Sequence, residues 1–391
     1  MKPLDFEVFA SQYWNARACL MPKRPERFAG LAFDHRLFIA SLRYSATPAR
    51  AHFFDVNGVA GEMLVQPWQV DDCIRAGMTI CKTGVDTHLP ELAAQTRALR
   101  ASVALPCEMD FAYYWSARGG GFGLHYDNHP VFICQLAGRK AWSYGAEPAT
   151  RTPRVSCVYD ADVVRRVRNA GTLVAEPADL QTTILEPGDM LYLPSGTWHR
   201  ASAVDGESRA LTLRVFDAAI GELVEHSLKT RMFGDAAWRD GLPLIAAHGV
   251  VANPPPALVE MLRARIRALR DLVSAIDEDS LLSAWCAMQA SVTEGVAATE
   301  VRRGSRIAFS DGVRVLWLQD DRGSFGRFFT SDTEFELRTD KVPWLRMAID
   351  RGVFVAEEIC GWGDQCVPWD NAREQLQELI EDGVLHVERN S

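Results

Sequence analysis

The chain has 391 residues, of which 48% are hydrophobic and 24% are charged, and its formal net charge is −9. This length suits two or three domains, and this composition is that of a soluble globular protein. No apolar run approaches the roughly 20 residues of a membrane helix, the N-terminus lacks the apolar core of a signal peptide, and the net negative charge argues against general attraction to nucleic acid. We therefore expect a cytoplasmic protein without a membrane partner.

The nine cysteines are scattered along the chain and form no CxxC pair. Their odd number and irregular spacing fit neither a disulfide framework nor a zinc ribbon. We expect most of them to be small buried hydrophobic residues, which agrees with a reducing compartment.

The first hundred residues mix short helices and strands, and the pattern predicts helices from Phe6 to Tyr13 and from Leu89 to Leu99. From about Ser102 to Asp217 the pattern changes to short apolar runs rich in aromatic and β-branched residues and separated by Gly, Pro and Asp. Such runs predict an all-β sandwich or barrel. They are VALP, FAYYWS, VFICQL, KAWSYG, TTILEPGDMLYLP and RALTLRVF.

Helices are predicted again from about Ala218 to residue 300. A start signal at Pro254-Pro255-Pro256 precedes an apolar stripe at helical spacing, formed by Leu258, Leu262, Ile266, Leu269, Val273 and Ile276. The stripe fits a helix packed on its own domain and fits a dimerisation helix equally well.

The last segment, from about Val301 to Ser391, resembles a small α/β domain. Strand-like RVLWLQ and FFTSDTEFEL precede helix-like VPWLRMAIDRG and NAREQLQELIEDG, and the short strand VLHVE closes the segment, as in a winged-helix unit. The segment contains 12 Lys and Arg against 17 Asp and Glu. This balance argues against phosphate binding and favours a structural or protein-contact role.

The stretch GLHYDNH, after a run of glycines, places His125, Asp127 and His129 on alternate positions. In a strand these side chains would share one face, so an imidazole and a carboxylate could chelate one metal ion. LPSGTWH offers a third ligand, His199, after a tight turn. Two His and one carboxylate with open positions opposite is the ligand set of non-haem Fe(II) oxygenases. The alternatives are a surface His beside an unrelated Asp and, for His199, a hydrogen-bonded core His.

Two cations lie on predicted strands after these motifs. Lys140, in AGRKAWSYG, could neutralise the far carboxylate of a chelating dicarboxylate such as 2-oxoglutarate, or it could be a solvated strand-end lysine. Arg214, in LTLRVF, lies inside an apolar strand, where an unpaired charge is costly. We expect Arg214 to meet an anion, either an acidic side chain or a ligand carboxylate.

The stretches HYDNHPVFICQLAGRKAW and LEPGDMLYLPSGTWH resemble the JmjC/cupin-like class of 2-oxoglutarate-dependent oxygenases. Within that class the chain is most similar to the ribosomal oxygenases, which are hydroxylases of ribosomal proteins. The N-terminal FASQYWNARACLM, the helical segment and the winged-helix-like tail follow the same order in that family. The resemblance covers most of the chain, but only the two metal motifs are specific.

The resemblance implies an α+β fold in three parts. A JmjC/cupin-like oxygenase domain, residues 1–217, would contain a double-stranded β-helix (jelly-roll) core at about 102–217. A helical dimerisation segment, 218–300, and a C-terminal winged-helix-like domain, 301–391, would follow. The expected cofactors are Fe(II), held by His125, Asp127 and His199, and 2-oxoglutarate, bound by Lys140.

The chain departs from the family pattern near the expected co-substrate. Relatives often carry an Asn on the strand before the HxD motif, where this chain has FAYYWS, and Tyr114 or Ser116 is expected to substitute. We expect His129 to contact substrate near the mouth of the site, with an exposed loop His as the alternative. Tyr113 and Trp142 could also shape the substrate pocket, or they could belong to the core.

These expectations combine into a hydroxylase of a protein or peptide side chain, with Arg or His hydroxylation of a ribosomal protein as the family precedent. The presence of Asp127 favours hydroxylation, because related halogenases carry a small residue there. A basic target would suit an acidic enzyme. The alternatives are the same chemistry on a small molecule or biosynthetic peptide, and a non-catalytic cupin-like binding protein or winged-helix regulator.

Overall fold

The computed structural model describes residues 4–24, 26–44, 48–54, 60–159, 179–241, 255–290, 300–331, 333–362 and 366–388. The chain divides into two compact units, each treated separately below. The first comprises residues 1–102 and 107–217, and the second comprises residues 103–106 and 218–391. No helix among these described segments is long and apolar enough to cross a membrane.

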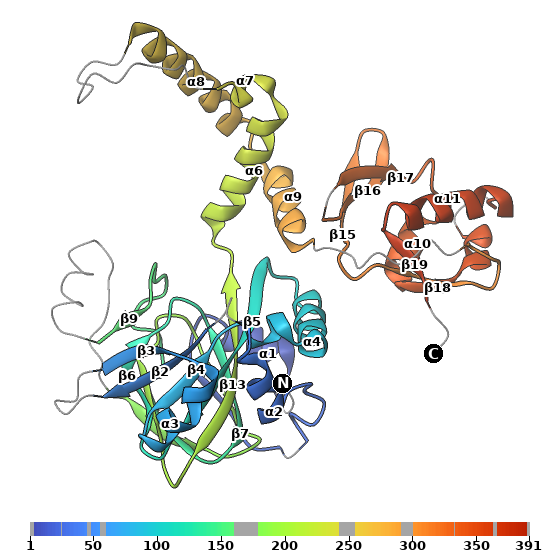
Figure 1. Ribbon diagram of the computed structural model, residues 1–391. Helices are drawn as coiled ribbons and strands as arrows, with labels where there is room; N and C mark the ends of the chain where they lie inside the picture. Colours follow the sequence, from blue (N-terminus) through green and yellow to red (C-terminus); the bar gives the residue numbers. More distant parts are fainter. Residues whose placement is uncertain are drawn as a thin grey trace. The chain divides into compact units, whose positions relative to one another are not determined.

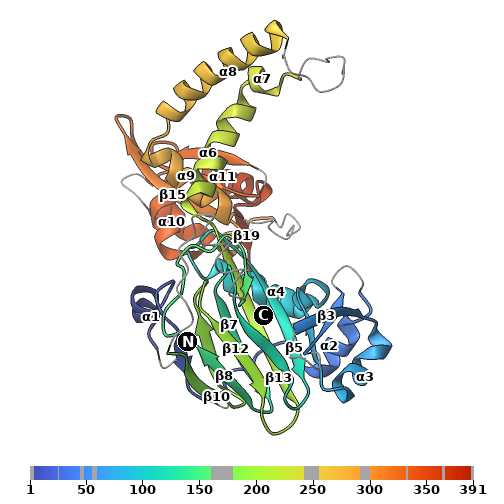
Figure 2. The same ribbon diagram turned by 90° about the vertical axis from the view of Figure 1, so that its left-hand side faces the viewer.

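The first unit is built on two antiparallel sheets (Figure 1). In order across the larger sheet the strands are β1 (Cys19–Met21), β11 (Met190–Leu193), β7 (Val131–Ala137), β13 (Ser208–Asp217), β5 (Cys107–Ser116), β4 (Thr79–Lys82), β2 (Ala49–Phe54) and β3 (Ala60–Val65). The smaller sheet has the order β10 (Gln181–Leu185), β8 (Lys140–Tyr144), β12 (His199–Ala203), β6 (Gly121–Tyr126) and β9 (Cys157–Val158). Figure 2 shows β8, β10 and β12 side by side in the smaller sheet.

The two sheets share a hydrophobic core, as the predicted sandwich requires. One buried cluster combines Ile133 and Leu191 of the larger sheet with Trp142 and Ala201 of the smaller sheet. Alternate residues of each strand point into this core, because successive side chains of a strand face opposite ways. The predicted β-sandwich core is therefore confirmed.

Short helices surround the sandwich: α1 (Phe6–Gln12), α2 (His35–Ser41), η1 (Pro67–Gln69), α3 (Val70–Arg75), η2 (Val85–His88) and α4 (Pro90–Ala101). Helices α1 and α4 match the two predicted from the sequence. The four strands β1 to β4 come from the first hundred residues and extend the larger sheet, whereas the core was expected to begin near residue 102. The apolar run VALP, residues 103–106, forms no strand, so that prediction was wrong.

The second unit contains the helices α6 (Ile220–Gly234), α7 (Ala236–Arg239), α8 (Pro256–Ser274), α9 (Glu278–Gln289), α10 (Leu345–Arg351) and α11 (Trp369–Glu381), with the turn η3 (Ala356–Gly361). Its two small sheets have the orders β18 (Val353–Val355), β14 (Arg306–Phe309), β19 (Leu385–Val387) and β15 (Arg314–Asp320), β16 (Gly323–Phe329), β17 (Glu334–Arg338). FFTSDTEFEL, expected as a strand, spans the end of β16, a turn and β17, because Thr330 and Thr333 bond across that turn.

The core of the second unit includes the fully buried Trp344 and Leu376. Trp344 precedes β18 in the sequence, and Leu376 follows it on α11. Helix α8 contains the predicted apolar stripe from Leu258 to Val273 and begins at Pro256, whereas Ile276 lies after its end at Ser274. Pro254 of the predicted start signal lies outside the described residues. A winged-helix character for 301–391 stays a prediction.

Candidate metal centre

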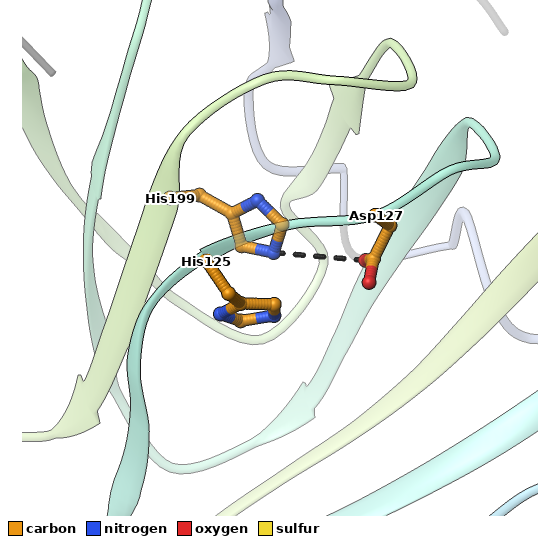
Figure 3. Close-up of side chains that lie close together, drawn as sticks. All are labelled: His125, Asp127 and His199. Carbon is orange, nitrogen blue, oxygen red and sulfur yellow. Dashed lines mark ion pairs between the residues drawn. The ribbon is translucent and has the colours of Figure 1, made fainter. Parts of the chain in front are cut away.

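The three predicted ligands lie together in the first unit (Figure 3). One ligand atom from each of His125, Asp127 and His199 lies within 4.8 Å of the others. The His199 Nε2 and Asp127 Oδ2 atoms are 3.7 Å apart, and the two imidazole centroids are 4.2 Å apart. His125, the residue before the last of β6, is the register partner of His199, the first residue of β12, so antiparallel pairing places the two rings side by side.

Hydrogen bonds orient both imidazoles. The Nδ1 of His125 lies 2.7 Å from the carbonyl oxygen of Gly123, and the Nδ1 of His199 lies 2.9 Å from that of Thr197. A carbonyl can only accept, so each Nδ1 carries the proton and donates it. Each Nε2 is then left with its lone pair, which is the tautomer that a metal-binding His requires.

Burial and mutual charge favour the ligating protonation states. Burial, followed by the neighbouring His125, lowers the pKa of His199 to about 4, so this ring is neutral at pH 7. Burial would raise the pKa of Asp127, but His125 and His199 oppose it, and the net pKa lies below its ordinary value. The two imidazoles, each with its Nε2 directed away from the carbonyl that its Nδ1 contacts, and one carboxylate fit a divalent transition metal and leave other coordination positions open.

Two glycines allow the backbone to bring these ligands together. A Cβ built on Gly121, at the start of β6, would lie 1.8 Å from the carbonyl oxygen of Ala201 on β12. Gly196 has a φ of +74°, and a Cβ there would lie 1.9 Å from the carbonyl oxygen of Thr150. Only glycine fits such approaches, so both turns depend on their glycines.

Lys140 lies inside the sandwich, on β8, with 2% of its surface exposed. Its Nζ donates to the Ser116 Oγ at 2.9 Å and lies about 6 Å from the rings of Tyr114 and Trp142. No carboxylate of the described residues is recorded in an ion pair with it, and burial lowers the pKa of its ammonium group to about 8. The alternative of a solvated strand-end lysine is therefore wrong.

Arg214, on β13, meets an acidic side chain, which is one of the two anions expected for it. Its Nε donates to the Asp110 Oδ1 at 2.7 Å, and its Nη2 donates to the Oδ2 of the same carboxylate. Asp110 is its cross-strand register partner on β5. Two hydrogen bonds from the guanidinium of Arg214 thus go to an acidic side chain of the chain itself. The other anion considered for Arg214 was a ligand carboxylate.

The expected pocket residues separate onto two faces. Ser116 and Tyr114 share one face of β5 with the Lys140 ammonium, and Ser116 also accepts from the Thr79 hydroxyl at 3.0 Å. Tyr113 points to the opposite face, where its hydroxyl lies 3.2 Å from the His35 Nδ1. The expectation that Tyr113 shapes the pocket at the metal is therefore wrong, because neighbouring residues of a strand face opposite ways.

Trp142 belongs to the core between the sheets, and its ring also stacks on His199 with centroids 5.9 Å apart. It therefore lies beside both a metal ligand and Lys140. Its indole Nε1 is buried with no hydrogen-bond partner among the described residues.

His129 differs from the residue expected at a strand end. Strand β6 ends at Tyr126, so Asp127 and His129 lie in the following turn. His129 is 8% exposed, its Nδ1 lies 3.1 Å from the Asn128 Oδ1, and its ring packs on Phe216 with centroids 4.5 Å apart. An exposed loop His is therefore wrong, and a substrate contact stays a prediction.

Two residues near His125 were missed by the sequence analysis. The Phe122 ring lies 6.0 Å from the His125 ring, and the His52 ring lies 4.5 Å from Phe122. His52 comes from β2, in the part of the chain for which no sheet position was predicted. The alternation in ARAHFF could have indicated a strand, but it could not have indicated that His52 lies beside Phe122.

Residues 90–223 match the model of the JmjC domain. The chain is 27% identical over 303 residues to the bifunctional lysine-specific demethylase and histidyl-hydroxylase NO66 of Aedes aegypti, covering 72% of this chain and 45% of that protein. It is 35% identical over 262 residues to ribosomal oxygenase 1 of Bos taurus, covering 62% of this chain and 37% of that protein. The chain thus spans less than half the length of these two relatives.

Comparison of folds points the same way. The Escherichia coli ribosomal oxygenase YcfD, solved in complex with cobalt and 2-oxoglutarate, superposes with a TM-score of 0.54 over 99% of both chains at 18% identity. A complex of YcfD with cobalt and succinic acid gives the same TM-score at 17% identity. At these identities the likeness establishes the fold. Residues 90–223 thus carry a JmjC domain match, and the chain is similar to the ribosomal oxygenases in both sequence and fold.

Proposed function

We propose that the chain is an Fe(II)- and 2-oxoglutarate-dependent hydroxylase of a protein or peptide side chain. The observation that carries the proposal is the convergence of His125, Asp127 and His199, with both imidazole Nδ1 atoms bonded to carbonyls. Such a set would hold Fe(II) on one side and leave the other side for co-substrate and oxygen. When bound, the iron with 2-oxoglutarate and O2 would supply the oxidation of an unactivated C–H bond, yielding succinate and CO2.

Lys140 and Ser116 are the residues we assign to the far carboxylate of 2-oxoglutarate. The buried ammonium group of Lys140 has one hydroxyl acceptor and no ion pair among the described residues, which destabilises the folded chain. An anionic ligand beside it would offset this loss. Thr79 donates to Ser116, so the hydroxyl proton of Ser116 remains available for a carboxylate oxygen. Tyr114 and Trp142 would form the walls between this anchor and the metal.

The remaining residues would orient the reaction. The Gly123 and Thr197 carbonyls hold the two imidazoles, so the metal position is fixed before substrate arrives. Burial of His199 keeps water from that side of the site. Phe122 and His52, beside His125, are positioned to contact the substrate side chain.

The substrate class follows from the relatives by analogy. Two relatives are named as ribosomal oxygenase and as histidyl-hydroxylase, and a cytoplasmic ribosomal protein modified at Arg or His is the corresponding proposal here. A basic substrate would complement the net charge of −9.

The test is to load the purified chain with Fe(II) anaerobically, add 2-oxoglutarate and oxygen, and measure succinate with and without candidate ribosomal proteins. We expect substrate-stimulated succinate formation and one added oxygen in the intact mass of one candidate. His125→Ala should abolish both. If neither succinate nor oxygen incorporation appears with any candidate while iron binds, the chain is a binding protein or acts on a small molecule.

We further propose that α8 mediates homodimer formation. Leu262, Ile266 and Val273 on its apolar stripe are 46%, 52% and 50% exposed. Such a continuous stripe of large aliphatic side chains is unfavourable in water, and a second copy of the same helix would cover it.

A further inference from the structure

The first unit contains a crevice of about 570 Å³, separate from the candidate metal centre. It lies on the face of β5 that points away from the candidate metal ligands. One wall is formed by Lys23 and by residues between Phe28 and His35, and Tyr113 and Arg209 of the larger sheet form part of the other. Tyr114 and Ser116, on the opposite face of β5, belong to the candidate metal centre. The sheet itself therefore separates the two sites.

The floor of this crevice is aromatic. Phe33 packs on Tyr113 with ring centroids 5.1 Å apart, and Phe28 lines the same space. Phe33 and Tyr113 are 9% and 1% exposed, so the rings are held in place by the surrounding core. A crevice of this size with rigid aromatic walls and few polar groups has the character of a small-molecule site.

The polar groups of the crevice are mainly donors. Arg209 lies over the Trp115 ring at 5.4 Å and gives one Nη2 bond to Glu207 at 3.1 Å, while its buried Nε has no acceptor among the described residues. A guanidinium has five N–H donors, so this one has capacity left. Lys23 lies 3.7 Å from Glu186 in a pair that is about half exposed, which is a weak interaction.

Among the described residues that line the crevice, Asp34 is the one carboxylate, and it caps a helix. Its Oδ1 accepts the Leu37 N–H at 2.9 Å as the N-cap of α2. His35 bonds to the Tyr113 hydroxyl, and burial followed by the Arg209 charge lowers the pKa of His35, so its ring stays neutral at pH 7. Among the described residues that line the crevice, the two cations Lys23 and Arg209 therefore outnumber the carboxylates.

We infer that this crevice binds a small organic anion with a flat apolar body, such as an aromatic carboxylate. The ring system would lie against Phe28, Phe33 and Tyr113, and the carboxylate would accept from Arg209 and Lys23. The inference does not depend on the oxygenase function.

The test uses isothermal titration calorimetry on the full chain with two matched probes, 2-naphthoate and the neutral 2-naphthamide. We expect 2-naphthoate to bind about tenfold more tightly, the ratio expected for one charge-assisted hydrogen bond. Arg209→Gln should remove most of the preference for 2-naphthoate over 2-naphthamide. Lys23→Gln, an exposed change that does not threaten folding, should weaken 2-naphthoate alone.

Lys140→Met is the matched control, because it removes the cation of the other anion site and should leave 2-naphthoate binding unchanged. Saturating 2-oxoglutarate should likewise fail to displace the probe. Equal affinities for the two probes, no binding of either, or loss of 2-naphthoate binding in Lys140→Met would each overturn the inference.

Discussion

The backbone N–H of Gly196 donates a hydrogen bond to the carbonyl oxygen of Asp127, with nitrogen and oxygen 2.7 Å apart. This bond joins the turn before His199 directly to the residue that supplies the carboxylate ligand. The two ligand motifs are far apart in sequence, but here they share one backbone contact. The three ligands are therefore preorganised by the protein chain itself, and metal binding should require little rearrangement.

Removing one ligand should abolish tight metal binding without unfolding the chain. We expect His125→Ala to weaken Co(II) binding by more than about 100-fold, because removal of a ligand should exceed the 10–100-fold typical of lost supporting contacts. The measurement is a Co(II) titration followed by visible absorbance. His226→Ala, on α6 in the second unit, is the matched control and should bind as wild type. Equal affinities for the two variants would mean that the metal lies elsewhere.

Lys140→Met should separate stability from co-substrate binding. The variant removes a buried ammonium group whose one hydrogen-bond acceptor in the described part of the chain is Ser116, while Ser116 keeps the hydrogen bond from Thr79. We expect the free energy of unfolding of the ligand-free chain to rise by about 1–3 kcal/mol. Binding of 2-oxoglutarate should fall at least tenfold (about 1.4 kcal/mol). Urea titration and calorimetry measure the two quantities, and a marked loss of stability would show that the ammonium group is structural.

Affinity for 2-oxoglutarate should depend on pH through the same residue. Burial lowers the pKa of Lys140 from 10.5 to about 8, so its charge is lost as the pH rises through that value. Between about pH 8 and 10.5 the unfolded chain binds more protons than the folded one, so this residue's contribution to stability increases with pH there. The dissociation constant for 2-oxoglutarate should rise correspondingly above pH 8.

Lys140→Arg provides the control for this pH profile, because a guanidinium stays charged throughout the range. If the variant still binds 2-oxoglutarate, its dissociation constant should be flat from pH 7 to 9.5 in calorimetric titrations, apart from changes common to both proteins. A wild-type profile that is equally flat would contradict the assignment of Lys140.

Local patterns were enough to predict which three side chains converge as candidate metal ligands, because two short motifs contain all three residues. The choice between Tyr113 and Tyr114 shows where such patterns fail. Neighbouring residues of a strand cannot both face one site, and only the pairing of β5 with β4 and β13 settles which one does. The alternation rule alone would have excluded one of the two.

Contacts between side chains on strands that are distant in sequence could not be predicted, because they depend on which strands pair. Arg214 needed an anion, but Asp110 lies on another strand, and the alternative of a ligand carboxylate fitted the sequence equally well. The position of His52 beside Phe122 depends on β2 joining a sheet whose other strands come mostly from beyond residue 102. Nothing local in the first hundred residues encodes that neighbour.

Arg214 and Asp110 should behave as a structural pair. Arg214→Met leaves a partly buried carboxylate without its cation, and we expect the free energy of unfolding to fall by about 1–3 kcal/mol, a value reduced for partial exposure. The double variant Asp110→Leu with Arg214→Met should recover most of this loss. Chemical denaturation of the wild type, the two single variants and the double variant measures the coupling. A large rise in the dissociation constant of 2-oxoglutarate in the double variant would instead assign Arg214 to the co-substrate.

The apolar stripe of α8 gives the sharpest test of oligomeric state. Ile266 is 52% exposed, and in a dimer its side chain would be covered by the partner helix. Ile266→Asp would then place a charge in an apolar contact, and we expect a dimer to become a monomer in size-exclusion chromatography with light scattering. Ala264→Asp introduces the same charge on the opposite side of the helix and should leave the mass unchanged. A wild-type chain that is monomeric at micromolar concentration would assign the stripe to some other partner, because two copies would then not cover it.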